Sequence, residues 1–342
     1  MTNGSSDCLL VLLGAGASYD CVDGATATIE ATLRPPLVDQ LFRVNQPFDR
    51  ILNRYPGARA RADEIRSRLQ QGKTLEELLR QMTAVPSLSL RRSMWQVPLY
   101  LQELLGEISQ HYVQAGSTKF ETMIAGIIQS AFRDVMILTV NYDLFVEHAL
   151  HSLMGKIFNA PRDYGWTCDD QRWTLVKLHG SVNWGRGLIP PRAMNSWVDV
   201  IPTLTDLKLD EEIVILSGHD DSRRFHDREF RYPALSLPIA GKTDFVCPAV
   251  HVDRARSFAS EATHVLVIGF SGLDQHVLEA LIRPINRLER LRVVCGSRQA
   301  GIDTWNRLTS VNQKFNITGP VFEGGFSQFV GSGELHKFLG VD

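Results

Sequence analysis

The sequence is organised around short, continuous runs of apolar residues that are separated by longer helical patterns. The runs are CLLVLLG at 8–14, VMILTV at 135–140, TLVKL at 174–178, EIVIL at 212–216, HVLVIGF at 264–270, LRVVC at 291–295 and ITGPVF at 317–322. Continuous rather than alternating apolar residues are typical of parallel strands that are covered on both faces. Helical patterns such as 143–154 and 274–288 lie between the runs. We therefore predict an α/β fold, a Rossmann-like doubly wound parallel sheet.

A long interval between the first two runs, residues 37–133, interrupts this alternation. It carries amphipathic patterns around 59–83, 96–114 and 117–133, the last of which begins with a candidate N-cap in STKFETM. We interpret the interval as a large helical insertion in a single domain that spans residues 1–342.

A second interval, residues 185–245, is richer in Pro, Arg and Asp than the rest of the chain. Its stretch GHDDSRRFHDREFRYP, at 218–233, has the composition of a solvated loop. His219 and His226 are possible metal ligands there, although a charged surface segment is the simpler interpretation. We predict a loop-rich second insertion.

The composition excludes several classes of protein. A formal net charge of −2 gives no electrostatic case for nucleic acid binding. The 5 cysteines form no C-x-x-C pair, which argues against a disulfide framework and a zinc ribbon. The apolar run at 8–14 has no basic residue before it and is too short to span a membrane, so it resembles neither a signal peptide nor a membrane anchor. We expect a soluble, cytoplasmic protein without a metal.

The first apolar run ends in the glycine-rich sequence Gly14-Ala15-Gly16-Ala17-Ser18. A strand followed by G-x-G begins many dinucleotide-binding units, because the glycines permit a tight turn and let the backbone approach a pyrophosphate. Tyr19 occupies the place of a third glycine, so the fingerprint is incomplete and a tight turn without a ligand remains an alternative. The Ser18 hydroxyl is suited either to capping the next helix or to contacting a phosphate.

Three further runs end in polar or glycine-rich sequences. They are Asn141-Tyr142-Asp143 after the second run, His179-Gly180-Ser181 after the third, and Gly269-Phe270-Ser271 with Asp274 after the fifth. Taken singly, His179 could be a structural hydrogen bonder and Asp274 a helix N-cap. Because the carboxyl ends of parallel strands meet at one edge of a sheet, the four sequences together predict one ligand-binding crevice.

At these four motifs the sequence resembles the sirtuin-like (Sir2-like) family, and in particular its zinc-less bacterial branch. GAGAS is similar to the NAD loop of that family, NYD to its Asn-x-Asp motif, HG to its catalytic His-Gly, and GFSGLD to the G-[YF]-S-x-x-D run of the bacterial branch. PALSLPIAGK at 233–242 and VFEGGFSQF at 321–329 fit that branch as well. The four-cysteine zinc module and the G-I-P-x-F-R loop of sirtuin deacylases are absent, and residues 20–37 read DCVDGATATIEATLRPPL instead.

The resemblance implies roles for the residues of the crevice. Asn141 would position a water molecule below the anomeric carbon of the NAD+ ribose, and Asp143 or its backbone would hold the nicotinamide carboxamide. His179 would contact the ribose hydroxyls and act as a general base, which suits an imidazole near neutral pH. The implied catalytic residues are thus Asn141 and His179, and the implied NAD+ contacts are Gly14, Ala15, Gly16, Ser18, Tyr142, Asp143, Gly180, Gly269, Ser271 and Asp274.

The zinc-less branch includes proteins of bacterial antiphage defence that deplete NAD+ on infection, so the resemblance implies an NAD+ glycohydrolase that releases nicotinamide and ADP-ribose. An ADP-ribosyltransferase or protein deacylase, and a non-catalytic sensor of NAD or ADP-ribose, remain alternatives. Because constitutive NAD+ cleavage would kill the cell, we expect the activity to be gated. We expect a homo-oligomer or a separately encoded partner, such as a HerA-like ATPase or an Argonaute-like protein, to provide it.

Overall fold

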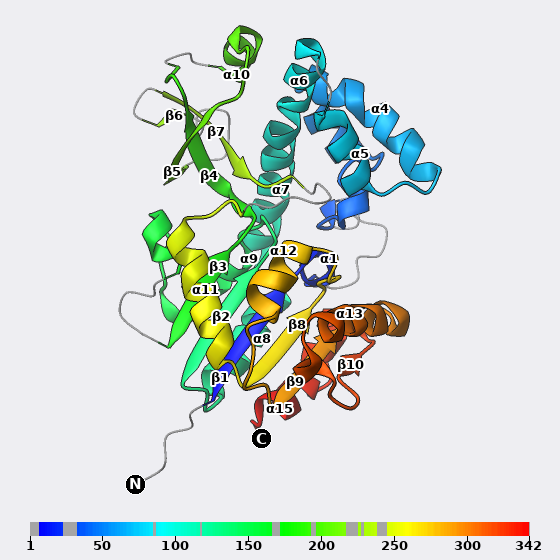
Figure 1. The fold of residues 1–342 in the computed structure, drawn as a ribbon. Helices are drawn as coiled ribbons and strands as arrows, with labels where there is room; N and C mark the ends of the chain where they lie inside the picture. The colour runs from blue at the N-terminus through cyan, green and yellow to red at the C-terminus, as the bar shows by residue number, and fades with distance from the viewer. Residues whose placement is uncertain are drawn as a thin grey trace.

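The computed structural model describes residues 7–22, 33–84, 87–116, 118–165, 172–192, 196–216, 225–226, 229–237 and 245–341. Figure 1 shows a parallel sheet in the lower part of the view. A smaller antiparallel sheet and a group of helices lie above the end of the parallel sheet from which α1 and α12 begin. No helix in the described part of the chain combines the length and the apolar character needed to cross a membrane.

The larger sheet confirms the predicted Rossmann-like α/β fold. Its strands are β1 (Cys8–Leu13), β2 (Asp134–Thr139), β3 (Trp173–Lys177), β8 (His264–Ile268), β9 (Arg290–Val294) and β10 (Val321–Phe322). They pair in the order β10-β9-β8-β1-β2-β3, and every pairing is parallel. The strand order reverses between β1 and β8, which is where ligands bind in sheets of this kind.

Both faces of this sheet are buried, which explains the continuous apolar runs. Leu9 and Val11 of β1 belong to the hydrophobic core on one face, whereas Leu10 and Leu12 belong to the core on the other. The first core includes residues of α8 (Lys119–Gln129), α9 (Phe145–Met154), α14 (Gly325–Gly331) and α15 (Glu334–Leu339). The second includes residues of α11 (Ala249–Glu261) and α13 (Arg298–Val311).

Two sequence-based expectations about elements were wrong. The run at 212–216 is not a strand of the parallel sheet, because β5 (Leu209–Ile215) pairs antiparallel with β4 (Gly180–Leu188). The helix expected over 274–288 consists of α12 (Gln275–Val277) and a π-helical turn, η5 (Leu278–Ile282). Pro284 follows shortly after and has no amide hydrogen to continue a helix.

The segment predicted to be loop-rich contains strands instead. A sheet of order β5-β4-β7-β6 includes β7 (Glu229–Leu235) and β6 (Phe225–His226), while His219 lies outside the described residues. Phe230 and Tyr232 are buried and alternate with the less buried Arg231, which is the pattern of a strand with one buried face. The many charged residues of the segment made this alternation hard to recognise in the sequence. The short helices α10 (Trp197–Val200) and η3 (Ile201–Thr203) belong to the same part of the chain.

The interval between β1 and β2 is mostly helical where it is described. After α1 (Ala15–Tyr19) it contains η1 (Val38–Gln40), α3 (Gln46–Leu52), α4 (Pro56–Gln70), α5 (Leu75–Thr83), α6 (Leu88–Met94), α7 (Gln96–Ala115) and α8. Short helices η2 (Pro161–Asp163) and η6 (Gln313–Phe315) lie elsewhere in the chain. The division into one domain with insertions at 37–133 and 185–245 stays a prediction.

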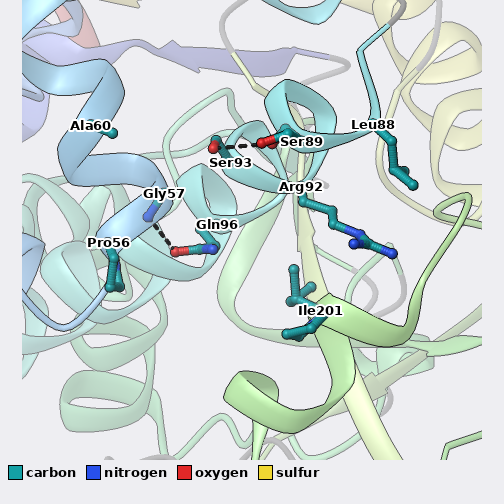
Figure 2. Close-up of a pocket in the computed structure, with 10 residues that line it drawn as sticks. Pro56, Gly57, Ala60, Leu88, Ser89, Arg92, Ser93, Gln96 and Ile201 are labelled. Carbon is teal, nitrogen blue, oxygen red and sulfur yellow. Dashed lines mark hydrogen bonds between the residues drawn. The ribbon is translucent and has the colours of Figure 1, made fainter.

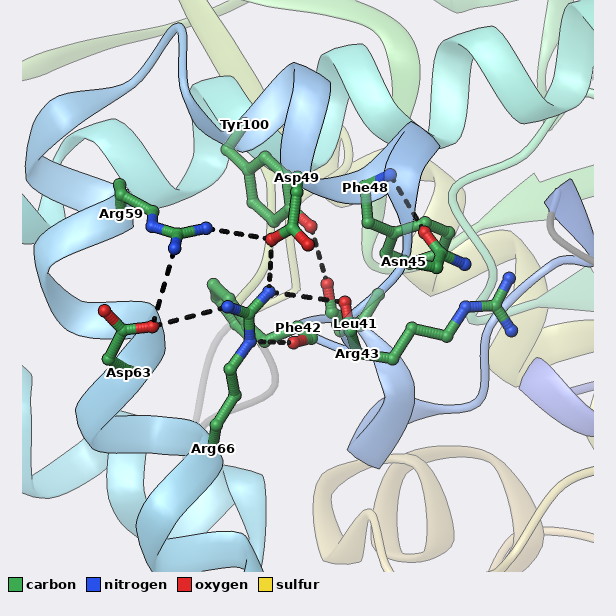
Figure 3. Close-up of polar contacts among 10 residues, drawn as sticks. All are labelled: Leu41, Phe42, Arg43, Asn45, Phe48, Asp49, Arg59, Asp63, Arg66 and Tyr100. Atoms are coloured by element: carbon green, nitrogen blue, oxygen red, sulfur yellow. Dashed lines mark hydrogen bonds and ion pairs between the residues drawn. The ribbon is translucent and has the colours of Figure 1, made fainter.

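A polar network fixes the segment between η1 and α4 (Figure 3). Arg66 of α4 donates through Nε to the Phe42 carbonyl oxygen at 2.7 Å and pairs through Nη2 with Asp49 at 2.7 Å. Arg59 also pairs with Asp49, at 2.9 Å, and the Tyr100 hydroxyl donates to the Leu41 carbonyl oxygen at 2.8 Å. These contacts hold in place the chain that directly follows η1.

The helical segment and the antiparallel sheet contact one another. The Arg92 guanidinium of α6 donates to the Leu204 carbonyl oxygen at 2.9 Å, and Gln102 of α7 donates to the Trp184 carbonyl oxygen at 3.2 Å. A hollow of about 470 Å³ lies at this junction, and its lining includes Arg92 and Ile201. Figure 2 shows these two side chains from α6 and η3 beside one another. The two segments that interrupt the βα alternation therefore pack together above the parallel sheet.

We expect His251, on α11, to make the protein sensitive to mild acid. Its side chain is 1% exposed, and burial lowers the pKa of its imidazole to about 4. Between pH ~6.5 and about 4 the unfolded chain binds a proton that the folded chain does not, so stability falls as the pH falls through this window, by up to about 1.4 kcal/mol per pH unit. Denaturant unfolding of the parent and His251→Phe at pH 7, 6, 5 and 4.5 measures this. A difference between the two proteins that does not change with pH would contradict the expectation.

Candidate functional site

The glycine-rich loop lies where the strand order reverses. The amide of Gly14, at the end of β1, donates to the Ile268 carbonyl oxygen of β8 at 3.0 Å. The amide of Gly16 donates to the Gly269 carbonyl oxygen, also at 3.0 Å. These bonds join two of the four predicted strand ends directly.

This junction has no room for side chains. A Cβ atom at Gly14 would lie 2.6 Å from the Gly269 oxygen, and one at Gly269 would lie 2.1 Å from the Ala17 nitrogen. Gly269 also has φ = 60°, a backbone conformation that favours glycine. Gly14, Gly16 and Gly269 are therefore required by the close approach of the two loops.

A relay of hydrogen bonds connects the first loop to the end of β2. The Asn141 amide donates through Nδ2 to the Gly14 carbonyl oxygen at 2.9 Å and to Ser18 Oγ at 2.8 Å. The Ser18 hydroxyl then donates to Asp143 Oδ2 at 2.5 Å, and Asp143 Oδ1 accepts from the Phe145 amide at 3.3 Å. Ser18 therefore does not cap α1, one of the two roles left open by the sequence, but orients the Asn141 and Asp143 side chains.

Asp143 is an unusual carboxyl group. Burial raises its pKa above the ordinary value, and the Lys177 ammonium and the Ser18 hydroxyl only partly offset this effect. The Ser18 hydroxyl and the Phe145 amide fix the orientation of its two oxygens. It retains lone pairs that can accept a hydrogen bond from an amide of a bound ligand.

His179 pairs with Asp274 at the same edge of the sheet. His179 Nε2 lies 3.0 Å from Asp274 Oδ2, and the His179 side chain is only 8% exposed. Asp274 Oδ1 meanwhile accepts from the backbone amides of His276 and Val277 at 3.1 and 3.2 Å. Asp274 is thus both the N-cap of α12 and the partner of His179, so that α12 fixes the orientation of the imidazole.

These residues surround one cavity of about 1320 Å³ at the carboxyl edge of the sheet. Of the residues predicted to be functional, those that line it are Gly14, Ala15, Gly16, Ser18, Asn141, Tyr142, Asp143, His179, Gly269, Ser271 and Asp274. The opposite wall comes from the helical segment and includes Leu41, Leu75 and Leu105. The four motifs therefore form one crevice, which the helices close from above.

Gly180 has a different position from the rest. It begins β4 with φ = 85°, and a Cβ atom there would lie 1.8 Å from the carbonyl oxygen of Ala234 in β7. The residues that line the cavity do not include it. The close neighbour of Gly180 in the described structure is therefore the backbone of the second sheet, and its contact with NAD+ stays a prediction.

The sequence analysis assigned no role to several residues of the cavity or beneath it. Arg34 lines the cavity, lies over the Tyr19 ring at 4.5 Å and donates to the Tyr19 carbonyl oxygen at 2.8 Å. Arg307 of α13 lines it near Ser271, whose carbonyl oxygen accepts from Arg307 at 2.7 Å. Lys177 lies below the NYD loop, and its position inside an apolar run was a signal that could have identified it.

The cysteines and histidines in the described part of the chain form no metal-binding cluster. Within the described ranges no group of three or more His, Cys, Asp or Glu side chains is arranged to hold a metal ion, and Cys8, Cys21, Cys247 and Cys295 are free thiols. Cys168 lies outside the described residues. That the protein works without a metal stays a prediction.

A family comparison matches part of the chain. A model of the SIR2-like domain matches residues 135–294, which run from β2 to the end of β9 and include the NYD, HGS and GFSGLD motifs. This part of the chain is similar to a SIR2-like domain. The match begins after the GAGAS loop, but hydrogen bonds join that loop to Asn141 and Gly269 inside the matched region.

Solved structures of Sir2 proteins are similar to this chain at low identity. One is a mutant Sir2 homologue in complex with 2′-O-acetyl ADP ribose, at 14% identity over 91% of this chain and 94% of that chain, with a TM-score of 0.42. Another is a Sir2 homologue in complex with NAD, at 13% identity over 90% and 91% of the two chains, with a TM-score of 0.38. A comparison with curated proteins gives no match.

Proposed function

We propose that this protein hydrolyses NAD+ to nicotinamide and ADP-ribose, and that it acts as an effector of bacterial antiphage defence by depleting NAD+. The observation that carries the proposal is the convergence of the Asn141–Ser18–Asp143 relay and the His179–Asp274 pair on one cavity. A SIR2-like domain with these groups is suited to cleaving the bond between nicotinamide and ribose.

In the proposed reaction, the bond between ribose C1′ and the nicotinamide nitrogen breaks, and its electron pair leaves with nicotinamide. The oxygen of a water molecule forms the new bond to C1′, and one proton of that water passes to His179, which returns it to solvent. Asp274 orients the imidazole for this transfer, since its carboxylate is itself fixed by two backbone amides.

The relay supplies orientation for the leaving group and the water. Asp143 accepts from the carboxamide of nicotinamide with a carboxylate that Ser18 and the Phe145 amide have already aimed. Asn141 directs the water through its amide oxygen, since its nitrogen is engaged by Gly14 and Ser18. Fixed positions for both reactants account for a large part of the rate of such a reaction.

Incubation of the purified protein with NAD+, followed by chromatography and mass spectrometry, tests this proposal. Hydrolysis gives nicotinamide and ADP-ribose in equal amounts. Nicotinamide with ADP-ribose attached to a protein would indicate a transferase, and NAD+ that binds but stays intact would indicate a sensor. Either of these two results contradicts the proposal.

We further propose that assembly gates the activity, through a homo-oligomer or through a defence partner such as a HerA-like ATPase or an Argonaute-like protein. The helical segment forms one wall of the cavity, so an assembly that contacts α4 and α5 has a direct route to the site. Ordering of residues 20–37 over NAD+ by such an assembly is part of this proposal, and residues 23–32 lie outside the described part of the chain.

A dilution series tests the gating. The specific NADase activity is expected to fall on dilution, in parallel with loss of the larger species in size-exclusion chromatography with light scattering. For a heterocomplex, adding the partner is expected to restore activity at a fixed concentration of this chain. A monomer whose specific activity is high and independent of concentration would contradict the proposal.

A further inference from the structure

A buried lysine lies directly beneath the loop that carries Asn141 and Asp143. Lys177, the last residue of β3, has a side chain that is 0% exposed. A lysine is almost never fully buried unless it is paired, because removing its charge from water costs several kcal/mol. The partners of Lys177 therefore indicate what it stabilises.

The three N–H donors of Lys177 have three acceptors on two elements. Nζ lies 2.8 Å from Glu147 Oε1 of α9 and 3.5 Å from the Tyr142 carbonyl oxygen, and it also donates to the Asp143 carbonyl oxygen. Glu147 Oε1 is in addition an acceptor for the Tyr164 hydroxyl, at 3.1 Å. An ammonium group that is satisfied in this way fixes the positions of the groups around it.

The position of Lys177 in the strand matters as much as its contacts. Lys177 is the last residue of β3, and His179 follows it by two residues, in the turn that leads into β4. Lys177 therefore connects the strand end that carries His179 to the loop that carries Asn141 and Asp143. The position of each half of the proposed active site relative to the other therefore depends on this one side chain.

We propose that Lys177 is the positioning residue of the site. It holds the backbone of Tyr142 and Asp143 at a fixed distance from His179, and Glu147 serves to keep its ammonium group in place. The expected effect of Lys177 on turnover rests on the proposed NAD+ hydrolysis. Its expected effect on the position of the loop does not. Lys177 itself touches neither NAD+ nor the water.

The charge pair is best removed as a whole. Lys177→Met alone would leave Glu147 buried without its cation, and the protein could unfold for that reason. The double variant Lys177→Met/Glu147→Gln is neutral and close in volume. The matched control is Tyr164→Phe, which removes the other hydrogen bond to Glu147 Oε1 but leaves Lys177 and its three acceptors in place. Thermal melting of all three proteins verifies that they are folded.

Hydrogen–deuterium exchange of the full chain measures how firmly Lys177 holds the loop, and it does not depend on enzymatic activity. In the double variant the amides of residues 140–145 are expected to exchange at least about tenfold faster than in the parent, because the loop has lost its anchor. Tyr164→Phe is expected to change their exchange less than about threefold. Parental exchange in the double variant, or an equal change in the control, would overturn the proposal.

Turnover of NAD+ adds the catalytic consequence. In the double variant kcat is expected to fall at least about tenfold while KM stays within about threefold, because small displacements of reacting groups cost rate more than binding. A double variant with parental kcat would overturn the inference. If the parent itself does not hydrolyse NAD+, the proposed function fails, whereas the exchange experiment still decides the role of Lys177.

Lys177→Arg provides a second test if the double variant melts at too low a temperature. It keeps the positive charge beside Glu147, but the planar guanidinium presents its donors in a different geometry from an ammonium group. The same amides are expected to exchange faster in this variant than in the parent. Unchanged exchange would overturn the proposal.

Discussion

Replacing His179 with alanine is expected to lower NAD+ hydrolysis by about 10²–10⁴-fold, the usual effect of removing a general base. His179 lies at the end of β3, lines the cavity, and has its imidazole oriented by Asp274 Oδ2 at 3.0 Å. Steady-state rates of the parent and His179→Ala, measured under conditions in which the parent is active, provide the test. An unchanged rate in a folded variant would remove His179 from the mechanism.

Asp274→Asn is the informative companion to this variant. Its remaining oxygen can still accept from the amides of His276 and Val277, so α12 keeps its cap. The amide nitrogen that replaces Oδ2 is a donor, and it would force His179 Nε2 to be an acceptor. We therefore expect Asp274→Asn to melt near the parental temperature but to lose much of the activity. Loss of stability without loss of activity would make Asp274 a helix cap only.

The parallel sheet was predictable because double-sided burial leaves a signature within each strand. The run at 8–14 is apolar throughout since alternate residues of β1 face two different cores. The crevice was predictable for a topological reason, because neighbouring parallel strands end at the same edge. The second sheet was not, since its buried residues, such as Phe230 and Tyr232, alternate with charged ones in a segment that has the composition of a loop.

The contacts within the site depend on distances that a sequence does not contain. Asp274 was a candidate helix cap, and the structure adds a second role because His179, 95 residues earlier, reaches its other oxygen. Ser18 was expected either to cap a helix or to contact a phosphate, yet its hydroxyl joins Asn141 to Asp143. In both cases one polar side chain makes several bonds at once, and only the tertiary structure shows which of them form.

Asn141→Ala is expected to lower NAD+ hydrolysis by at least about 10²-fold, because the water loses its directing group and the relay loses a member. Binding of NAD+ is expected to survive, since the hydrogen bonds that shape the first loop, from the amides of Gly14, Gly16 and Ala17, do not involve the Asn141 side chain. Isothermal titration calorimetry of NAD+ with the variant, beside its hydrolysis rate, separates the two effects.

Ser18→Ala distinguishes the two roles of Asn141. That substitution breaks the bonds of Ser18 to Asn141 Nδ2 and Asp143 Oδ2 but leaves the Asn141 amide and its 2.9 Å bond to Gly14 in place. If Asn141 directs the water, Ser18→Ala loses clearly less activity than Asn141→Ala. If the two variants lose activity equally, Asn141 acts through the relay alone. If calorimetry shows that Asn141→Ala no longer binds NAD+, Asn141 is chiefly a structural residue of the strand end, and the proposed catalytic role is wrong.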